Sequence, residues 1–90
     1  MQNFDADIRS RIVDLVTSIL AQNSITAEVT ADAHLVDVGL TSMDMVNLML
    51  SVEAEFDFTI PQDKITPENF QSVATLERMV AGELRAAQAA

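Results

Sequence analysis

The stretch that decides the fold is "VDVGLTSMDMVNLML", which runs from Val36 to Leu50. A lone serine, Ser42, opens a run in which apolar residues recur at helical spacing. Serine is a favourable N-cap because its hydroxyl accepts a hydrogen bond from a first-turn amide. We therefore expect a helix to begin at or just after Ser42 and to continue to about Phe56, before Pro61 forbids any extension.

This helix is expected to be apolar on two sides. On a helical wheel, successive residues are about 100° apart, and one group of apolar residues spans an arc as wide as an ordinary core-packing face. It holds Met45, Leu48, Met49, Val52 and Phe56. A second apolar arc lies about 140° from the centre of the first. It holds Met43, Val46 and Leu50.

A helix with two apolar sides is either buried all round or binds something else, and 90 residues leave little room for a fully buried helix. Another helix or a loop could cover the second arc, but we expect it to dock a protein. Flexible methionine suits such a surface. The residues of this expected partner face are Met43, Asp44, Val46, Asn47, Leu50 and Glu53. Asp44 and Glu53 are expected to meet basic side chains of the partner.

Helical spacing also marks both ends of the chain. The first helix is expected from about Asp5 to Gln22, and the last from near Ser72, with Gly82 as a weak point and fraying from Arg85. The apolar residues at helical spacing in these two segments are Ile8, Ile12, Leu15, Val16, Ile19, Val73, Leu76, Met79, Val80 and Leu84.

The connection between the first two long helices is unusually long. It carries possible apolar anchors, namely Ile25, Val29, Leu35, Val38 and Leu40, so we expect it to pack on the core. A short helical turn is expected at Thr66–Phe70, because Thr66 can cap it and Pro67 suits a first helical position. The prediction is an all-α four-helix bundle with three long helices, one short helix and a long structured loop. It forms one domain over residues 1–90, with an ordered core at about 5–84.

Composition excludes several classes of function. The chain has 14 acidic and 5 basic residues and a net charge of −9, which disfavours binding to nucleic acids and anionic membranes and favours a basic protein partner. There are no cysteines, so disulfides and thiolate metal sites are excluded. No signal peptide and no membrane span of about 20 apolar residues is apparent, and we expect a soluble, cytoplasmic monomer.

Few residues suggest catalysis. His34 is the only histidine and is expected at the surface, and no acid–base pair, metal-ligand cluster or calcium-binding loop is recognisable. A non-enzymatic helical adaptor remains open, in which Ser42 only caps the helix and the arc of Met43, Val46 and Leu50 binds a protein partner. No catalytic and no metal-binding residue is predicted.

Two segments resemble the acyl carrier proteins. In "VGLTSMD", Gly39, Leu40, Ser42 and Asp44 match the motif that opens the family's second helix. In "EAEFDFTIP", the family's glutamate-rich helix end and its isoleucine–proline pair have counterparts. These are Glu53, Glu55, Phe56, Phe58, Ile60 and Pro61. The resemblance extends from the first helix to about Val80, and acidity, length and helix order agree with it.

The resemblance implies that Ser42 carries a 4'-phosphopantetheine arm, which a phosphopantetheinyl transferase attaches from coenzyme A. The arm ends in a thiol that holds acyl or aminoacyl cargo as a thioester. Further implied partners are a loading ligase or synthase and downstream acyl or aminoacyl transferases. The positive end of the helix dipole would lie beside the phosphodiester.

The sequence departs from the family at several positions. Thr41 replaces an aspartate that helps present the serine to the transferase, and Met43 replaces a leucine. Asn47 and Ala54 stand where general fatty-acid carriers usually have glutamates. These differences suggest a specialised carrier, and two cargo classes remain open: fatty acyl or polyketide intermediates, and amino acids loaded by an adenylating ligase.

Overall fold

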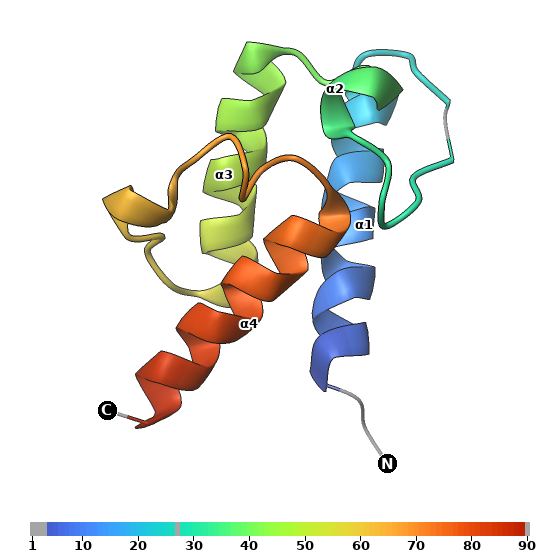
Figure 1. The fold of residues 1–90 in the computed structure, drawn as a ribbon. Coiled ribbons are helices and arrows are strands. Elements are labelled where there is room, and N and C mark those ends of the chain that lie inside the picture. Colours follow the sequence, from blue (N-terminus) through green and yellow to red (C-terminus); the bar gives the residue numbers. More distant parts are fainter. Residues whose placement is uncertain (1–3, 27, 90) are drawn as a thin grey trace.

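The computed structural model describes residues 4–26 and 28–89, so residues 1–3, 27 and 90 of the expected domain lie outside the described part. The fold is all-α, as predicted (Figure 1). The helices are α1 (Phe4–Gln22), α2 (Leu35–Val38), α3 (Ser42–Phe56) and α4 (Val73–Ala89), and the 3-10 helix η1 spans Gln62–Lys64. α3 begins and ends where the sequence predicts.

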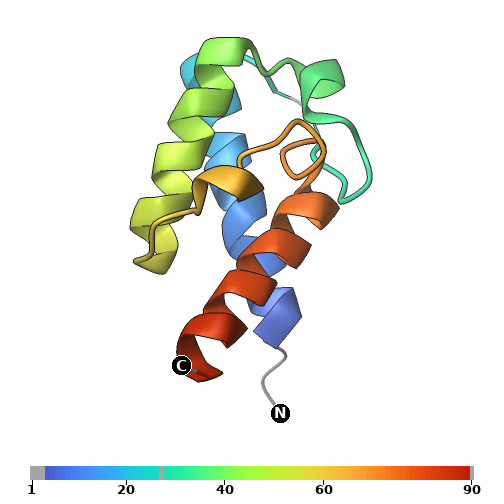
Figure 2. The ribbon, with the colours of Figure 1, turned by 60° about the vertical axis from the view of Figure 1, so that its left-hand side comes forward.

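α1 packs against both α3 and α4. α1 and α3 run in opposite directions, and α4 crosses in front of them in Figure 1. The turned view shows that the start of α3, the end of α1 and α2 lie at one end of the bundle, and the start of α1 and the end of α4 at the other (Figure 2). Ser42, the first residue of α3, therefore lies at the end of the bundle opposite the start of α1.

The core confirms the face assignments for α3. Leu48, Val52 and Phe56 are buried, and Met45 and Met49 pack against the core while half-buried. The second arc stays at the surface. The other buried apolar side chains are Ile8, Ile12, Val16, Ile19, Leu20, Leu35, Leu40, Ile60, Phe70, Val73, Leu76, Met79, Val80 and Ala81. Arg11 reinforces the packing of α1 on α3, because its Nε donates to Glu55 Oε2 at 2.8 Å and its guanidinium lies 4.5 Å from the Phe56 ring centroid.

The long connection packs on the core through the predicted anchors. Leu35 and Leu40 are buried, and Ile25, Val29 and Val38 pack against the core. Backbone hydrogen bonds from Leu35 N–H to Gln71 O at 2.8 Å and from Ala74 N–H to Ala31 O at 2.9 Å join this segment to the start of α4. α2 lies inside this connection and was not predicted, because a four-residue helix is too short to show a periodic pattern.

The helical turn predicted at Thr66–Phe70 forms as a hydrogen-bonded turn, but the short fourth helix of the fold is α2 and not this segment. Thr66 does cap it: Asn69 N–H donates to Thr66 Oγ1 and Phe70 N–H to Thr66 O, both at 3.2 Å. α4 begins after a reciprocal cap in which Ser72 N–H donates to Thr75 Oγ1 at 3.0 Å and Thr75 N–H to Ser72 Oγ at 3.2 Å. It continues to Ala89, past Arg85, where fraying was expected. No helix within residues 4–26 and 28–89 combines the length and apolarity needed to cross a bilayer.

Candidate functional site

The start of α3 is capped by Thr41 and not by Ser42. Thr41 has extended backbone angles, and its Oγ1 accepts the N–H of Asp44 at 3.2 Å, while Asp44 Oδ2 accepts the N–H of Thr41 at 2.9 Å. This is a capping box, in which two end groups of the helix satisfy each other. Thr41 and Asp44 stand three residues apart, which is the spacing by which a capping box can be recognised in a sequence.

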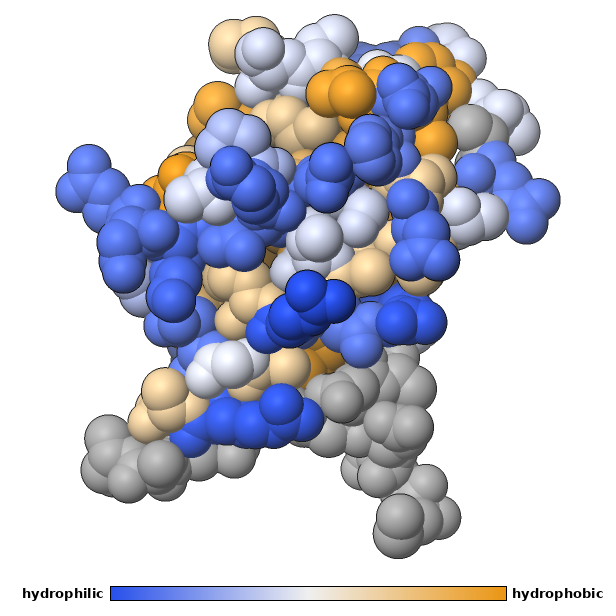
Figure 3. Space-filling model, viewed as in Figure 1, coloured by the Kyte–Doolittle hydropathy of each residue, from blue (hydrophilic) through white to orange (hydrophobic). Residues whose placement is uncertain are grey.

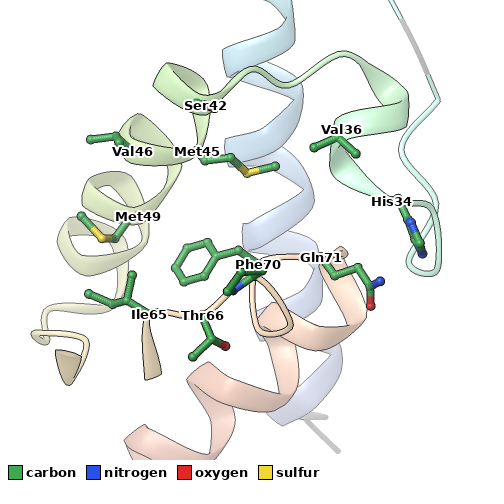
Figure 4. Close-up of a pocket in the computed structure, with 11 residues that line it drawn as sticks. His34, Val36, Ser42, Met45, Val46, Met49, Ile65, Thr66, Phe70 and Gln71 are labelled. Carbon is green, nitrogen blue, oxygen red and sulfur yellow. The ribbon is translucent and has the colours of Figure 1, made fainter. Parts of the chain in front are cut away.

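Ser42 is thereby the first residue of α3, and its side chain is exposed. It lies at the edge of a groove of about 590 Å³ between α2, α3 and the segment that precedes α4. In Figure 4, Met45 of α3 and Val36 of α2 point toward each other from opposite walls, with Phe70 below them. The N-terminus of α3 carries a partial positive charge, so an exposed hydroxyl here suits a phosphodiester.

Asp44 was expected to meet a basic side chain of the partner, and the structure corrects this expectation because the residue is buried. Its side chain is 7% exposed. Oδ2 accepts the Thr41 N–H and also the Nδ2–H of Asn23, each at 2.9 Å. The hydrogen bond from the Thr41 backbone, followed by that from Asn23, holds the pKa of the Asp44 carboxyl below its usual value. The carboxylate of Asp44 is therefore used for hydrogen bonds within the chain and not for a partner.

Glu53 also forms a hydrogen bond within the chain. It is half-buried, and Oε2 accepts the Ile60 N–H at 2.8 Å, which ties α3 to the segment after it. Asn47 is exposed on α3 as expected. The structure therefore brings the six residues of the expected partner face together on one helix but turns one of its two acids inward.

Exposed apolar side chains are the main feature of the surface around Ser42. Their exposed fractions are 73% for Met43, 48% for Val46, 54% for Leu50, 64% for Val36 and 43% for Ile65. In Figure 3, most apolar surface lies in the upper half of the view, where α2 and the start of α3 lie. Val36 lies in the four-residue α2 and Ile65 directly after η1, so neither residue shows the helical periodicity that would place it on this surface from sequence.

Other side chains add little chemistry. His34 is exposed, as expected, and lies at the rim of the groove. Within the described residues, no group of three or more His, Cys, Asp or Glu side chains could hold a metal ion. The geometry thus offers one accessible hydroxyl, a helix N-terminus and an apolar groove.

Comparison with known proteins gives the family. The family model described as the phosphopantetheine attachment site matches residues 10–81. The chain is 70% identical over 90 residues to aminoacyl carrier protein 1 of Bradyrhizobium diazoefficiens, and the match covers 100% of both chains. It is 51% identical over 84 residues to aminoacyl carrier protein 2 of the same organism, covering 93% of this chain and 94% of the relative.

Solved structures agree. A chain in the crystal structure of Bradyrhizobium japonicum glycine:[carrier protein] ligase complexed with glycylated carrier protein is 75% identical. That match has a TM-score of 0.71 and covers 80% of this chain and 97% of that one. The solution structure of a holo acyl carrier protein from Nitrosomonas europaea is 26% identical, with a TM-score of 0.64, and the match covers 94% of this chain and 99% of that one.

These matches do not favour the helical adaptor. They confirm the resemblance to the acyl carrier proteins. The chain belongs to the acyl and aminoacyl carrier protein family, and it is a carrier protein whose prosthetic group is 4'-phosphopantetheine.

Proposed function

We propose that Ser42 is the residue to which the phosphopantetheine arm is attached. The observation that carries this proposal is the exposed Ser42 side chain at the first position of α3, where capping is already supplied by Thr41 and Asp44. The hydroxyl is therefore available to a transferase without loss of the helix cap. The dipole of α3 favours the negative phosphodiester at this position. The arm supplies the thiol, and this chain supplies the attachment point and the surface that partners recognise.

The cargo that we propose is a small amino acid, with glycine as the first candidate. Support comes from the identity of 75% to a carrier chain in a structure with a glycine:[carrier protein] ligase, and from the full-length match to an aminoacyl carrier protein. The partners would be a phosphopantetheinyl transferase, an adenylating ligase and a downstream aminoacyl transferase. The chain itself would contribute no catalytic group.

The partner surface that we propose is mainly apolar. The exposed side chains of Val36 and Ile65 extend the second apolar arc of α3 on either side of the groove. The two acids contribute less, because Asp44 is buried and Glu53 accepts a backbone N–H. Apolar side chains of this kind bind through burial and shape, while exposed acids affect mostly association rate and orientation. Met43, Val46, Asn47 and Leu50 remain the α3 residues expected to contact the ligase.

Intact mass spectrometry tests the attachment site. The protein is incubated with coenzyme A and a broad-specificity phosphopantetheinyl transferase, beside Ser42→Ala and the control Ser51→Ala, which removes another serine of α3. We expect one phosphopantetheine on the wild type and on Ser51→Ala, and none on Ser42→Ala. Labelling of Ser42→Ala would assign the arm to another residue.

The cargo is tested separately on the modified protein. Incubation with ATP, an amino acid:[carrier protein] ligase and glycine should add one glycyl group that hydroxylamine removes, as expected for a thioester. Alanine and a larger amino acid such as leucine serve as competitors. Loading by a fatty-acyl ligase but by no aminoacyl ligase would contradict the proposed cargo and leave the attachment site unaffected.

A further inference from the structure

The end of α1 is closed by a rigid turn. Ser24 has a left-handed backbone with φ 60°, its N–H donates to Ala21 O at 3.0 Å, and Ile25 N–H donates to Leu20 O at 2.8 Å. These two bonds define a Schellman motif, which fixes the direction in which a chain leaves a helix. Asn23 is the last residue before the left-handed position, so its side chain is presented by a backbone of fixed geometry.

The same turn packs against the segment that leads to Ser42. A Cβ added to Gly39 would lie 2.9 Å from Ile25 Cδ1 and 3.7 Å from Leu20 Cδ2. Gly39 closes α2 with φ 121°, three residues before Ser42. The end of α1 thus supports the approach to α3 by direct contact.

A side-chain hydrogen bond links this turn to the first turn of α3. Asn23 Nδ2 donates to Asp44 Oδ2 at 2.9 Å, and the same oxygen accepts the Thr41 N–H at 2.9 Å. Thr41 and Asp44 flank the two residues Ser42 and Met43. One carboxylate oxygen therefore ties the backbone before the serine, and the helix turn after it, to the end of another helix.

We propose that Asn23 is a positioning residue for the modification of Ser42, acting through Asp44 to hold the first turn of α3 in one orientation against α1. This inference rests on Ser42 being the attachment site. The serine oxygen must reach the phosphorus of coenzyme A at a defined distance and angle in the transferase complex. A misplacement of about 1 Å in such a reaction can cost about 100-fold in rate. Without Asn23 the capping box remains, but its link to α1 is lost.

The first test compares Asn23→Ala with Gln22→Ala, a matched control on the preceding exposed residue. Steady-state kinetics of the transferase on each apo protein separate kcat from KM. We expect Asn23→Ala to lower kcat by about 3- to 10-fold, a fraction of the cost of a full misplacement, with KM within about twofold of the wild type. The reason is that the apolar docking surface is intact while the serine is less well placed. Gln22→Ala should match the wild type.

The second test asks whether Asn23 acts through Asp44. Asn23→Asp places a second carboxylate beside Asp44 and should lower kcat more than Asn23→Ala does. A double-mutant cycle combines Asn23→Ala with Asp44→Ala, which removes the oxygen that Asn23 bonds. We expect Asn23→Ala to lower kcat by less than about twofold further in the Asp44→Ala background, whereas an effect of Asn23 that is independent of Asp44 would be as large there as in the wild type.

The outcomes separate the inference from the proposed function. If the wild type is never labelled on Ser42, the proposed attachment site fails. If the wild type is labelled and Asn23→Ala is as fast as Gln22→Ala, or loses efficiency through KM alone, the positioning role of Asn23 is overturned. It is also overturned if Asn23→Ala lowers kcat as much in the Asp44→Ala background as in the wild type. Circular dichroism and thermal unfolding of each variant identify any loss that comes from unfolding, and the comparison of the two backgrounds still decides the question.

Discussion

Thr41 and Asp44 satisfy each other's backbone at the start of α3. The Thr41 N–H donates to Asp44 Oδ2 at 2.9 Å, and the Asp44 N–H donates to Thr41 Oγ1 at 3.2 Å. Ser42 lies between them and takes no part in this reciprocal cap. The hydroxyl of Ser42, which we propose as the attachment site, is therefore separate from the groups that stabilise the helix end.

Replacement of the cap should therefore affect stability at Thr41 and not at Ser42. We expect Thr41→Ala to lower the free energy of unfolding by about 1 kcal/mol, because one helix amide loses its acceptor, and Thr41→Ser to retain most of it. Ser42→Ala should change it by less than about 0.5 kcal/mol, as for an ordinary surface position. Urea unfolding followed by circular dichroism measures all three. A larger loss in Ser42→Ala than in Thr41→Ala would mean that the serine caps the helix after all.

The hydrogen bonds to Asp44 predict how stability responds to acid. Its pKa lies below the usual aspartate value because the Thr41 backbone and Asn23 bond to the charged form. Such a group stabilises the fold above its unfolded pKa of about 3.9, and this contribution is lost as the pH falls through the lower folded pKa. Urea unfolding from about pH 7 down to pH 2.5 should show a steeper loss below about pH 4 in the wild type than in Asp44→Asn. Parallel curves would show that the carboxyl titrates alike in both states.

The two apolar faces of α3 should differ in what they contribute. Leu48 is fully buried, so Leu48→Ala should lower the free energy of unfolding by about 2–5 kcal/mol. Met43 is largely exposed, so Met43→Ala should lower it by less than about 0.5 kcal/mol and yet reduce the catalytic efficiency of the loading ligase. Chemical unfolding and ligase kinetics on the same two variants make the comparison. Equal destabilisation by both would contradict the assignment of the faces.

The two glycines should respond in opposite directions to alanine. Gly82 lies in α4 with nothing within 4 Å of an added Cβ, so Gly82→Ala should stabilise the protein by about 0.5–1 kcal/mol through better helix propensity. Gly39 has φ 121°, and an added Cβ would lie 2.9 Å from Ile25 Cδ1, so Gly39→Ala should destabilise it. Thermal unfolding distinguishes the signs. A stabilising Gly39→Ala would show that this turn rearranges without cost.

Local patterns were enough to predict the long helices and the two faces of α3. Spacing near 3.6 residues per turn depends only on neighbours along the chain, so it indicated that Leu48 and Val52 face the core and that Met43 does not. Short elements carry no such period. For that reason the sequence does not indicate α2, and it does not distinguish the turn at Thr66–Phe70 from a short helix.

The candidate serine could likewise be identified from sequence, because its motif is contiguous and resembles a known family. The role of Asp44 could be identified only in part. Its spacing from Thr41 indicates the cap at the start of α3, but no local pattern indicates the second hydrogen bond of its carboxylate. Asn23 stands 21 residues earlier and reaches Asp44 only when α1 packs against α3. The sequence by itself determined where the three long helices form and which serine opens α3, because helical spacing depends on neighbours along the chain. The tertiary structure decided how the first turn of α3 is tied to α1, because the hydrogen bond between Asn23 and Asp44 joins the ends of two helices.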